Sequence, residues 1–233
     1  MLWGVLILYT IVAVYTMLHH ELWGDEVHSW NIAKASVGFL DLIANTRYEG
    51  HPPLWYIILW TISKFTQDPV YMQLIHLVIA CMLVILILFY SPFPFITRIL
   101  IPFGYFFIYE YSILSRNYAI GVLLAFFICL VIHGNFKYKV LLYYILLFLM
   151  SNTHLVALLL AASFHLYFLL SQIEGRKKRT MLAFHILIGG IIFLFSLYFI
   201  LDTRYLIPES SSPACFFNSR NFSLQCHIAK DIS

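Results

Sequence analysis

A succession of long apolar runs constrains the fold of this chain more than any other feature. A helix needs about 20 apolar residues, at 1.5 Å each, to cross the hydrocarbon of a bilayer. Of the 233 residues, 62% are hydrophobic and 11% are charged, whereas soluble domains carry about 25% charged residues. The sequence therefore predicts an all-α, polytopic membrane helix bundle, and its net charge of +3 gives no indication of nucleic-acid binding.

Six apolar runs are predicted to be membrane-spanning helices. They are Leu2–Leu18, Tyr71–Tyr90, Phe95–Tyr109, Tyr118–His133, Leu155–Leu170 and Met181–Leu201. The run Val140–Gln172 is too long for one crossing, and the polar stretch Ser151–His154 divides it into a helical hairpin. Leu54–Phe65 is only about 18 Å long as a helix, so we expect it to lie along the membrane interface. The total is seven crossings, of which Val140–Met150 is the weakest.

Basic residues predict which ends of these helices face the cytoplasm, because lysine and arginine collect in short cytoplasmic loops. Half of the 14 basic residues fall in three loops, which are 91–98, 134–139 and 172–180. With seven crossings these loops share the cytoplasmic side with the amino terminus. The non-cytoplasmic side then carries four polar segments, which are 19–70, 110–117, 151–154 and the tail 202–233. We expect a transmembrane module over 1–201 and a separate polar tail, in which Cys215 and Cys226 can pair if the compartment is oxidising.

Ionisable side chains gather on the predicted non-cytoplasmic side, above all in the loop 19–70. Charged groups at membrane depth are costly unless they face a polar cavity or one another, so such a set marks a candidate functional site. The set comprises Asp25, Glu26, Glu49 and His51 from the first loop, Glu110 and Arg116 from the second, and His154 from the third.

These residue types suit the transfer of a sugar from a polyprenyl-phosphate donor, whose lipid tail stays in the bilayer. The leaving phosphate is a weak base and needs no general acid, while one carboxylate can take the proton from the attacking hydroxyl. Arginine offers a bidentate fork to the departing phosphate. The predicted partners are therefore a polyprenyl-phosphate-linked sugar and membrane lipid, with the acceptor open.

Three sequence strings occur in the order found in a known enzyme family. They are Trp23-Gly24-Asp25-Glu26 with Trp30, then Glu49-Gly50-His51-Pro52-Pro53-Leu54-Trp55-Tyr56, and then Ser115-Arg116-Asn117-Tyr118-Ala119-Ile120. Over roughly 1–201 the chain resembles the GT-C glycosyltransferases, most closely their protein-mannosyltransferase and aminoarabinose-transferase-like branch. The resemblance implies an integral membrane enzyme that uses lipid-phosphate sugars, typically inverts the anomeric centre and generally needs no metal. It also implies that Asp25 is the catalytic base.

The resemblance and the residue types together give the candidate site. Asp25 and Glu26 are the catalytic candidates, and Arg116 and His51 are the candidates for binding the donor phosphate. The supporting candidates are Glu49, Glu110, Tyr118 and His154. No cofactor is predicted, and metal dependence is open. The chain departs from its relatives at Tyr118, where many carry a second acid, and those relatives are usually longer.

Several of these candidate residues also have a simpler structural interpretation. Asp25 suits the N-cap of a loop helix, and His51 precedes two prolines, which favour an extended turn. Arg116 can extend toward lipid headgroups. At the level of the whole chain, the alternatives are a non-catalytic membrane subunit and a transporter of a lipid-linked substrate.

Overall fold

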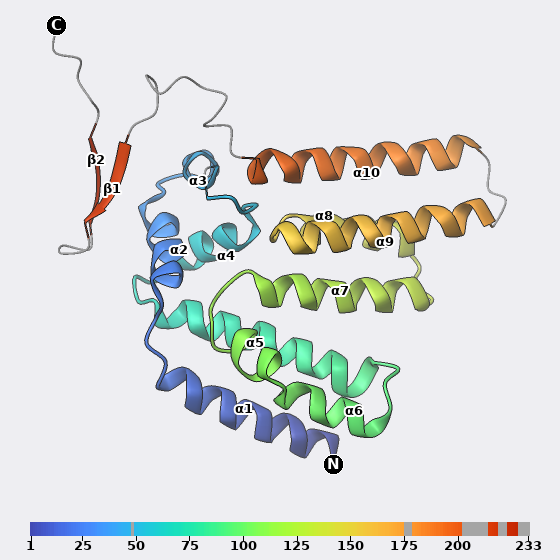
Figure 1. Ribbon diagram of the computed structural model, residues 1–233, viewed down its shortest axis with the longest axis horizontal. Coiled ribbons are helices and arrows are strands. Elements are labelled where there is room, and N and C mark those ends of the chain that lie inside the picture. Colours follow the sequence, from blue (N-terminus) through green and yellow to red (C-terminus); the bar gives the residue numbers. More distant parts are fainter. Residues whose placement is uncertain (48, 175–178, 202–213, 219–222, 228–233) are drawn as a thin grey trace, which may run out of the picture. The chain divides into compact units, whose positions relative to one another are not determined.

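The computed structural model describes residues 1–47, 49–174, 179–201, 214–218 and 223–227. The chain divides into two units, Met1–Ile200 and Leu201–Ser233. The first unit is helical, as predicted (Figure 1). Its α-helices are α1 (Leu2–Leu18), α2 (Gly24–Ala35), α3 (Phe39–Thr46), α4 (Leu54–Ser63), α5 (Val70–Ile85), α6 (Phe95–Leu100), α7 (Tyr118–His133), α8 (Lys139–Ser151), α9 (Leu155–Glu174) and α10 (Arg179–Ile200).

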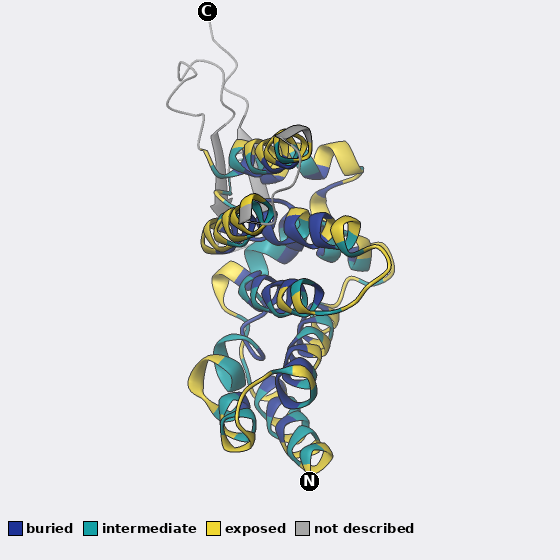
Figure 2. Ribbon diagram, turned by 90° about the vertical axis from the view of Figure 1, so that its right-hand side faces the viewer, coloured by how far each residue is buried: buried dark blue, intermediate teal, exposed yellow. Residues whose placement is uncertain are grey.

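The long helices of this unit lie side by side, and the short helices of the first polar loop cover one end of them (Figure 1). Helix α1 packs on α5, α5 on α7, α7 on α8, and α9 on both α8 and α10. Buried residues lie on the facing sides of these helices, while residues on the outer sides are exposed (Figure 2). Trp30 of α2 and Trp55 of α4 belong to the same hydrophobic cluster as Ile128 of α7 and Leu147 of α8. The loop helices are thus anchored to the bundle.

Three helical segments are long and apolar enough to cross a membrane, which is consistent with a membrane protein. They are Val70–Tyr90, in which α5 continues into the π-helical turn η1 (Leu86–Tyr90), Leu155–Ile173 and Met181–Ile200. The other apolar helices are shorter and are Leu2–Leu18, Leu54–Ser63, Tyr118–His133 and Lys139–Ser151. The predicted break at Ser151–His154 separates α8 from α9, as expected. The total of seven crossings stays a prediction.

The predicted continuous helix Phe95–Tyr109 is wrong. This segment forms α6, a 3-10 turn η2 (Ile101–Phe103) and a π-helical turn η3 (Phe106–Glu110). Pro102 has no N–H to donate and its ring obstructs a continuing helix. Gly104 has an extended backbone with φ −67° and ψ 151°, which ends the helical path before it resumes at Phe106.

Three of the polar segments predicted to lie outside the membrane, 19–70, 110–117 and 151–154, meet at one end of the helical unit. The Leu54 N–H donates to the Asn152 carbonyl at 3.2 Å, and the Asn117 side-chain amide donates to the Thr153 carbonyl at 3.0 Å. The amino terminus of α1 and the carboxyl ends of α7 and α9 lie at the other end (Figure 1). Arg176, Lys177 and Lys178, on which the predicted orientation partly depends, lie outside the described residues.

The second unit contains one antiparallel hairpin, which the sequence did not predict. Its strands are β1 (Ala214–Asn218) and β2 (Ser223–His227). The backbone register places Cys215 opposite Cys226. The pairing of these two cysteines stays a prediction, and the rest of the predicted tail lies outside the described residues.

Two adjacent glycines of α10 provide a matched test of helix packing. A Cβ atom at Gly189 would overlap the imidazole of His165 on α9, whereas a Cβ at Gly190 would have no heavy atom within 4 Å. We expect Gly189→Ala to destabilise the fold by about 1–3 kcal/mol, because a buried ring has to move. Gly190→Ala should match or slightly exceed the wild-type Tm. Thermal unfolding in detergent measures both, and equal Tm values for the two variants would contradict the packing described.

Candidate functional site

The carboxylate of Glu26 is fully buried and accepts three hydrogen bonds. Its Oε2 accepts from the Trp23 N–H at 2.8 Å and lies 2.9 Å from His20 Nε2. Its Oε1 accepts from the Ser115 N–H at 2.6 Å. The Trp23 bond closes the first turn of α2 in the manner of a capping box. The Ser115 bond ties α2 to the loop that carries Arg116, so Glu26 positions two parts of the chain and does not face solvent.

Asp25 and Arg116 form an ion pair, although they are 91 positions apart in the sequence. Arg116 Nη2 donates to Asp25 Oδ2 at 2.7 Å, and the two side chains are 28% and 67% exposed, respectively. Asp25 lies in the first turn of α2, where the helix dipole favours a carboxylate. The interpretation of Asp25 as the N-cap is wrong, because Trp23 is the N-cap.

Two aromatic rings, those of Tyr118 and His154, connect Arg116 to the third polar segment. The Arg116 guanidinium lies over the Tyr118 ring, with Cζ 5.2 Å from the centroid. The His154 imidazole meets the same ring edge-on, with centroids 5.0 Å apart. Gly121 makes room for this imidazole, since a Cβ there would lie 2.7 Å from His154 Cε1. Tyr118 thus connects Arg116 to His154.

His51 and His154 are both uncharged at neutral pH. Burial, followed by the nearby His51, lowers the pKa of His154 to about 4. Burial, followed by the charge of Arg116, lowers the pKa of His51. The Nδ1 atom of each ring is buried without a hydrogen-bond partner among the described residues. Each ring therefore retains a polar atom whose hydrogen bonding is not satisfied by the described residues.

Glu49 pairs with His28 and not with Arg116. His28 Nε2 lies 2.8 Å from Glu49 Oε2, and this hydrogen bond raises the pKa of His28 above its usual value. Burial raises the pKa of the Tyr56 hydroxyl, which lies near Ser29 on α2. Neither His28 nor Tyr56 was predicted from the sequence as a site residue. Tyr56 lies five residues after His51 in the string that contains the two prolines, and this position could have identified it as a site residue.

The structure brings most of the predicted site residues together. We call the group Asp25, Glu49, His51, Arg116, Tyr118 and His154 the outer cluster. Glu110 does not join it. Its carboxylate accepts a hydrogen bond from the Tyr105 hydroxyl at 2.9 Å, at the end of the broken segment that precedes the loop.

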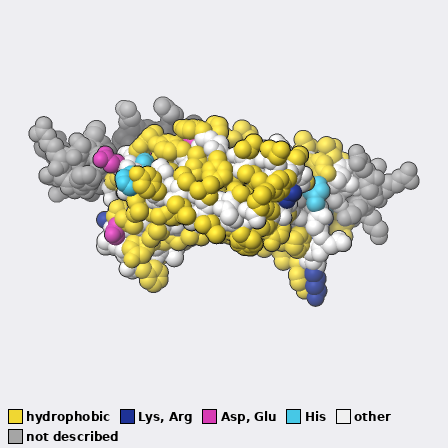
Figure 3. Space-filling view, turned by 90° about the horizontal axis from the view of Figure 1, so that it is seen from below, with side chains coloured by type: hydrophobic (Ala, Val, Ile, Leu, Met, Phe, Trp, Pro, Cys, Tyr) yellow, Lys and Arg dark blue, Asp and Glu magenta, His cyan; other side chains and the backbone are white. Residues whose placement is uncertain are grey.

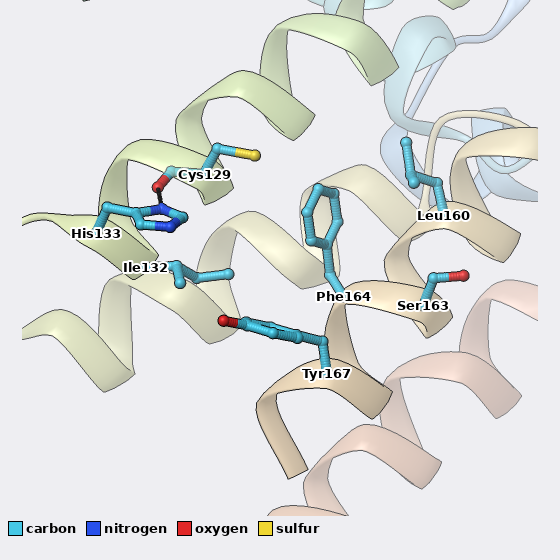
Figure 4. Close-up of a pocket in the computed structure, with 7 residues that line it drawn as sticks. All are labelled: Cys129, Ile132, His133, Leu160, Ser163, Phe164 and Tyr167. Atoms are coloured by element: carbon cyan, nitrogen blue, oxygen red, sulfur yellow. Dashed lines mark hydrogen bonds between the residues drawn. The ribbon is translucent and has the colours of Figure 1, made fainter. Parts of the chain in front are cut away.

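A separate apolar hollow of about 310 Å³ lies between α7 and α9 (Figure 4). Its lining residues are Cys129, Ile132, His133, Leu160, Ser163, Phe164 and Tyr167. They come from the carboxyl-terminal half of α7 and from α9, whereas the outer cluster lies at the amino-terminal end of α7. The hollow includes none of the predicted site residues.

Among the described residues, no group of three or more His, Cys, Asp or Glu side chains is arranged to hold a metal ion. Comparisons with known protein families, with curated proteins and with solved structures found no match. Any functional inference for this chain therefore depends on its own residues and their geometry.

The role of Glu26 can be measured as stability. In Glu26→Ala the donors of His20, Trp23 and Ser115 lose their acceptor, so we expect a loss of about 2–4 kcal/mol. Glu21 is an exposed carboxylate of the same connection, and Glu21→Ala should unfold at the wild-type temperature. Thermal unfolding in detergent compares the two variants. A Glu26→Ala protein as stable as Glu21→Ala would show that the three hydrogen bonds contribute nothing.

Proposed function

We propose that this chain is a multi-pass membrane glycosyltransferase. It transfers a sugar from a polyprenyl-phosphate donor to an acceptor hydroxyl on the non-cytoplasmic face, with inversion of the anomeric carbon. The observation that carries the proposal is the ion pair between Asp25 and Arg116, with His51 beside it. This reaction needs a carboxylate base and a phosphate-binding cation within reach of one sugar, and the outer cluster supplies both.

The distribution of side chains along the helical unit supports placement in a bilayer. On the face that Figure 3 displays, the surface between the two ends is largely hydrophobic. On the face that Figure 3 displays, acidic side chains lie at the end that carries α2–α4. In the proposed topology this is the non-cytoplasmic end, and the basic loops 91–98 and 134–139 are cytoplasmic.

Exposed apolar side chains of the first polar loop support contact with a lipid-linked donor. Val37, Leu40 and Phe65, at or near α3 and α4, are 86%, 82% and 87% exposed. Such side chains are costly in water and are stable in the interfacial region of a bilayer. In the proposal, α4 forms one wall of the groove for the polyprenyl chain. Its amino-terminal end follows His51, which binds the phosphate.

The proposed reaction is a single displacement. The acceptor oxygen attacks the anomeric carbon while its proton passes to Asp25. The bond between that carbon and the phosphate oxygen breaks, and its electron pair leaves with polyprenyl phosphate. Arg116 and His51 hold the departing phosphate, and Glu26 keeps α2 aligned with Arg116 without contacting substrate.

Replacing the base tests the proposal directly. Asp25→Asn should lower kcat by about 10²–10⁴-fold, the usual contribution of a general base, while donor binding is retained. The matched control is Glu21→Gln, which removes an exposed carboxylate four residues away and should leave turnover unchanged. The assay follows release of polyprenyl phosphate from a panel of polyprenyl-phosphate sugars by reconstituted protein. Turnover in Asp25→Asn equal to wild type, as a non-catalytic subunit predicts, would reject the assignment.

A conservative change at the cation tests the phosphate site separately. Arg116→Lys keeps the positive charge but loses the planar fork that binds two phosphate oxygens. We expect KM for the donor to rise about tenfold, the value of one charged hydrogen bond. Steady-state kinetics measure this change. An unchanged KM would remove Arg116 from the phosphate site.

A further inference from the structure

The Arg116 guanidinium is engaged with a carboxylate in this structure. Its Nη2 donates to Asp25 Oδ2 at 2.7 Å. The backbone behind it is fixed, since the Ser115 N–H bonds to Glu26 and the Arg116 N–H donates to the Leu114 carbonyl at 2.7 Å. Only the side chain of Arg116 is therefore free to change partners.

Within the outer cluster, Arg116 is the one residue with a permanent positive charge. His51 and His154 are kept neutral by burial, and Glu49 is already paired with His28. Among the members of this cluster, a phosphate finds no second permanently charged cation. It must therefore compete with Asp25 for the same guanidinium.

The proposed reaction makes conflicting demands on this ion pair. A carboxylate next to a guanidinium is a weaker base, because the opposite charge favours its ionised form. A guanidinium that is bonded to a carboxylate has fewer N–H groups for a phosphate. Neither residue can perform its full role while the pair persists.

We propose that binding of the donor transfers Arg116 from Asp25 to the lipid-linked phosphate and so frees the Asp25 carboxylate to act as base. This inference rests on the phosphate site proposed above and adds an order of events. The donor binds first, and only the donor complex has an unpaired carboxylate for the acceptor hydroxyl. The Asp25 carboxylate therefore stays paired with Arg116 whenever no donor is bound.

The exposure of the pair makes the exchange favourable. Asp25 is 67% exposed, and ion pairs in contact with water are weak because water competes for both charges. A phosphate offers two oxygens to the fork, and such a bidentate pair is stronger than a bond to a single carboxylate oxygen. The Tyr118 ring lies under the guanidinium and supports the Arg116 side chain whether it bonds to Asp25 or to a phosphate.

The proposed exchange of partners predicts that removing the Asp25 carboxylate tightens phosphate binding. The full chain in phosphatidylcholine nanodiscs is titrated with geranylgeranyl phosphate, and Kd is measured by isothermal titration calorimetry. In Asp25→Asn the guanidinium is already free, so Kd should fall about two- to fivefold, the value of an exposed ion pair. Asp25→Ser should give the same direction, which guards against a folding defect in one variant.

Two controls separate the exchange from a general effect of charge. Glu21→Gln removes one nearby negative charge without touching Arg116 and should leave Kd unchanged. The double variant Asp25→Asn/Arg116→Gln should bind more weakly than wild type, because the freed partner is absent. Geranylgeranyl phosphate should bind more tightly than inorganic phosphate. Equal Kd values for the two would overturn the lipid-linked identity of the ligand.

An unchanged or raised Kd in Asp25→Asn would overturn the exchange, since it would mean that Asp25 orients Arg116 for a phosphate that both contact. That result would leave sugar transfer intact. Conversely, a lowered Kd together with no turnover of any polyprenyl-phosphate sugar by the wild type would reject the glycosyltransferase and retain the exchange. The two proposals therefore fail by different measurements.

Discussion

The arrangement of this end of the protein depends on one buried carboxylate. Removing Glu26 from water is costly unless its oxygens are bonded, and the chain supplies donors from three places: the end of α1, the start of α2 and the loop before α7. Satisfying Glu26 therefore fixes how these three segments meet. Its neighbour Asp25 is turned about 100° around the same helix and so points outward, where Arg116 reaches it.

Two acidic residues that are adjacent in the sequence thus have different environments. One is enclosed and holds the backbone together, and the other is in contact with solvent and paired with a single cation. The rest of the outer cluster is supported by helix ends that pack into the bundle, through Trp30 and Trp55 and through the bond between Leu54 and Asn152. Sites built on such packed elements keep their geometry better than sites on isolated loops.

Apolar periodicity and length were enough to predict most helices, because a run such as Leu2–Leu18 or Tyr118–His133 has few alternatives to a helix. The same reasoning failed at Phe95–Tyr109, where Pro102 and Gly104 outweigh the apolar character of the run. The residue types of the candidate site were also readable from the sequence. Their partners were not, since the contact between Asp25 and Arg116 depends on long-range packing.

The burial of individual side chains also could not be predicted from the sequence. Nothing in the Asp25-Glu26 dipeptide indicates which carboxylate is enclosed, and Glu110 resembles a site residue until the broken segment places it beside Tyr105. Likewise, the neutral state of His51 and His154 follows from the surrounding atoms and not from residue type. These distinctions decide which groups are available for chemistry.

Two imidazoles associated with α9 are inserted against glycines of its neighbours. His154, immediately before this helix, occupies the space left by Gly121 of α7, and His165 occupies the space left by Gly189 of α10. The two positions are about 16 Å apart along the helix axis. Sliding α9 lengthwise would drive both rings into backbone at once, so piston-like motion of this helix is opposed on two flanks.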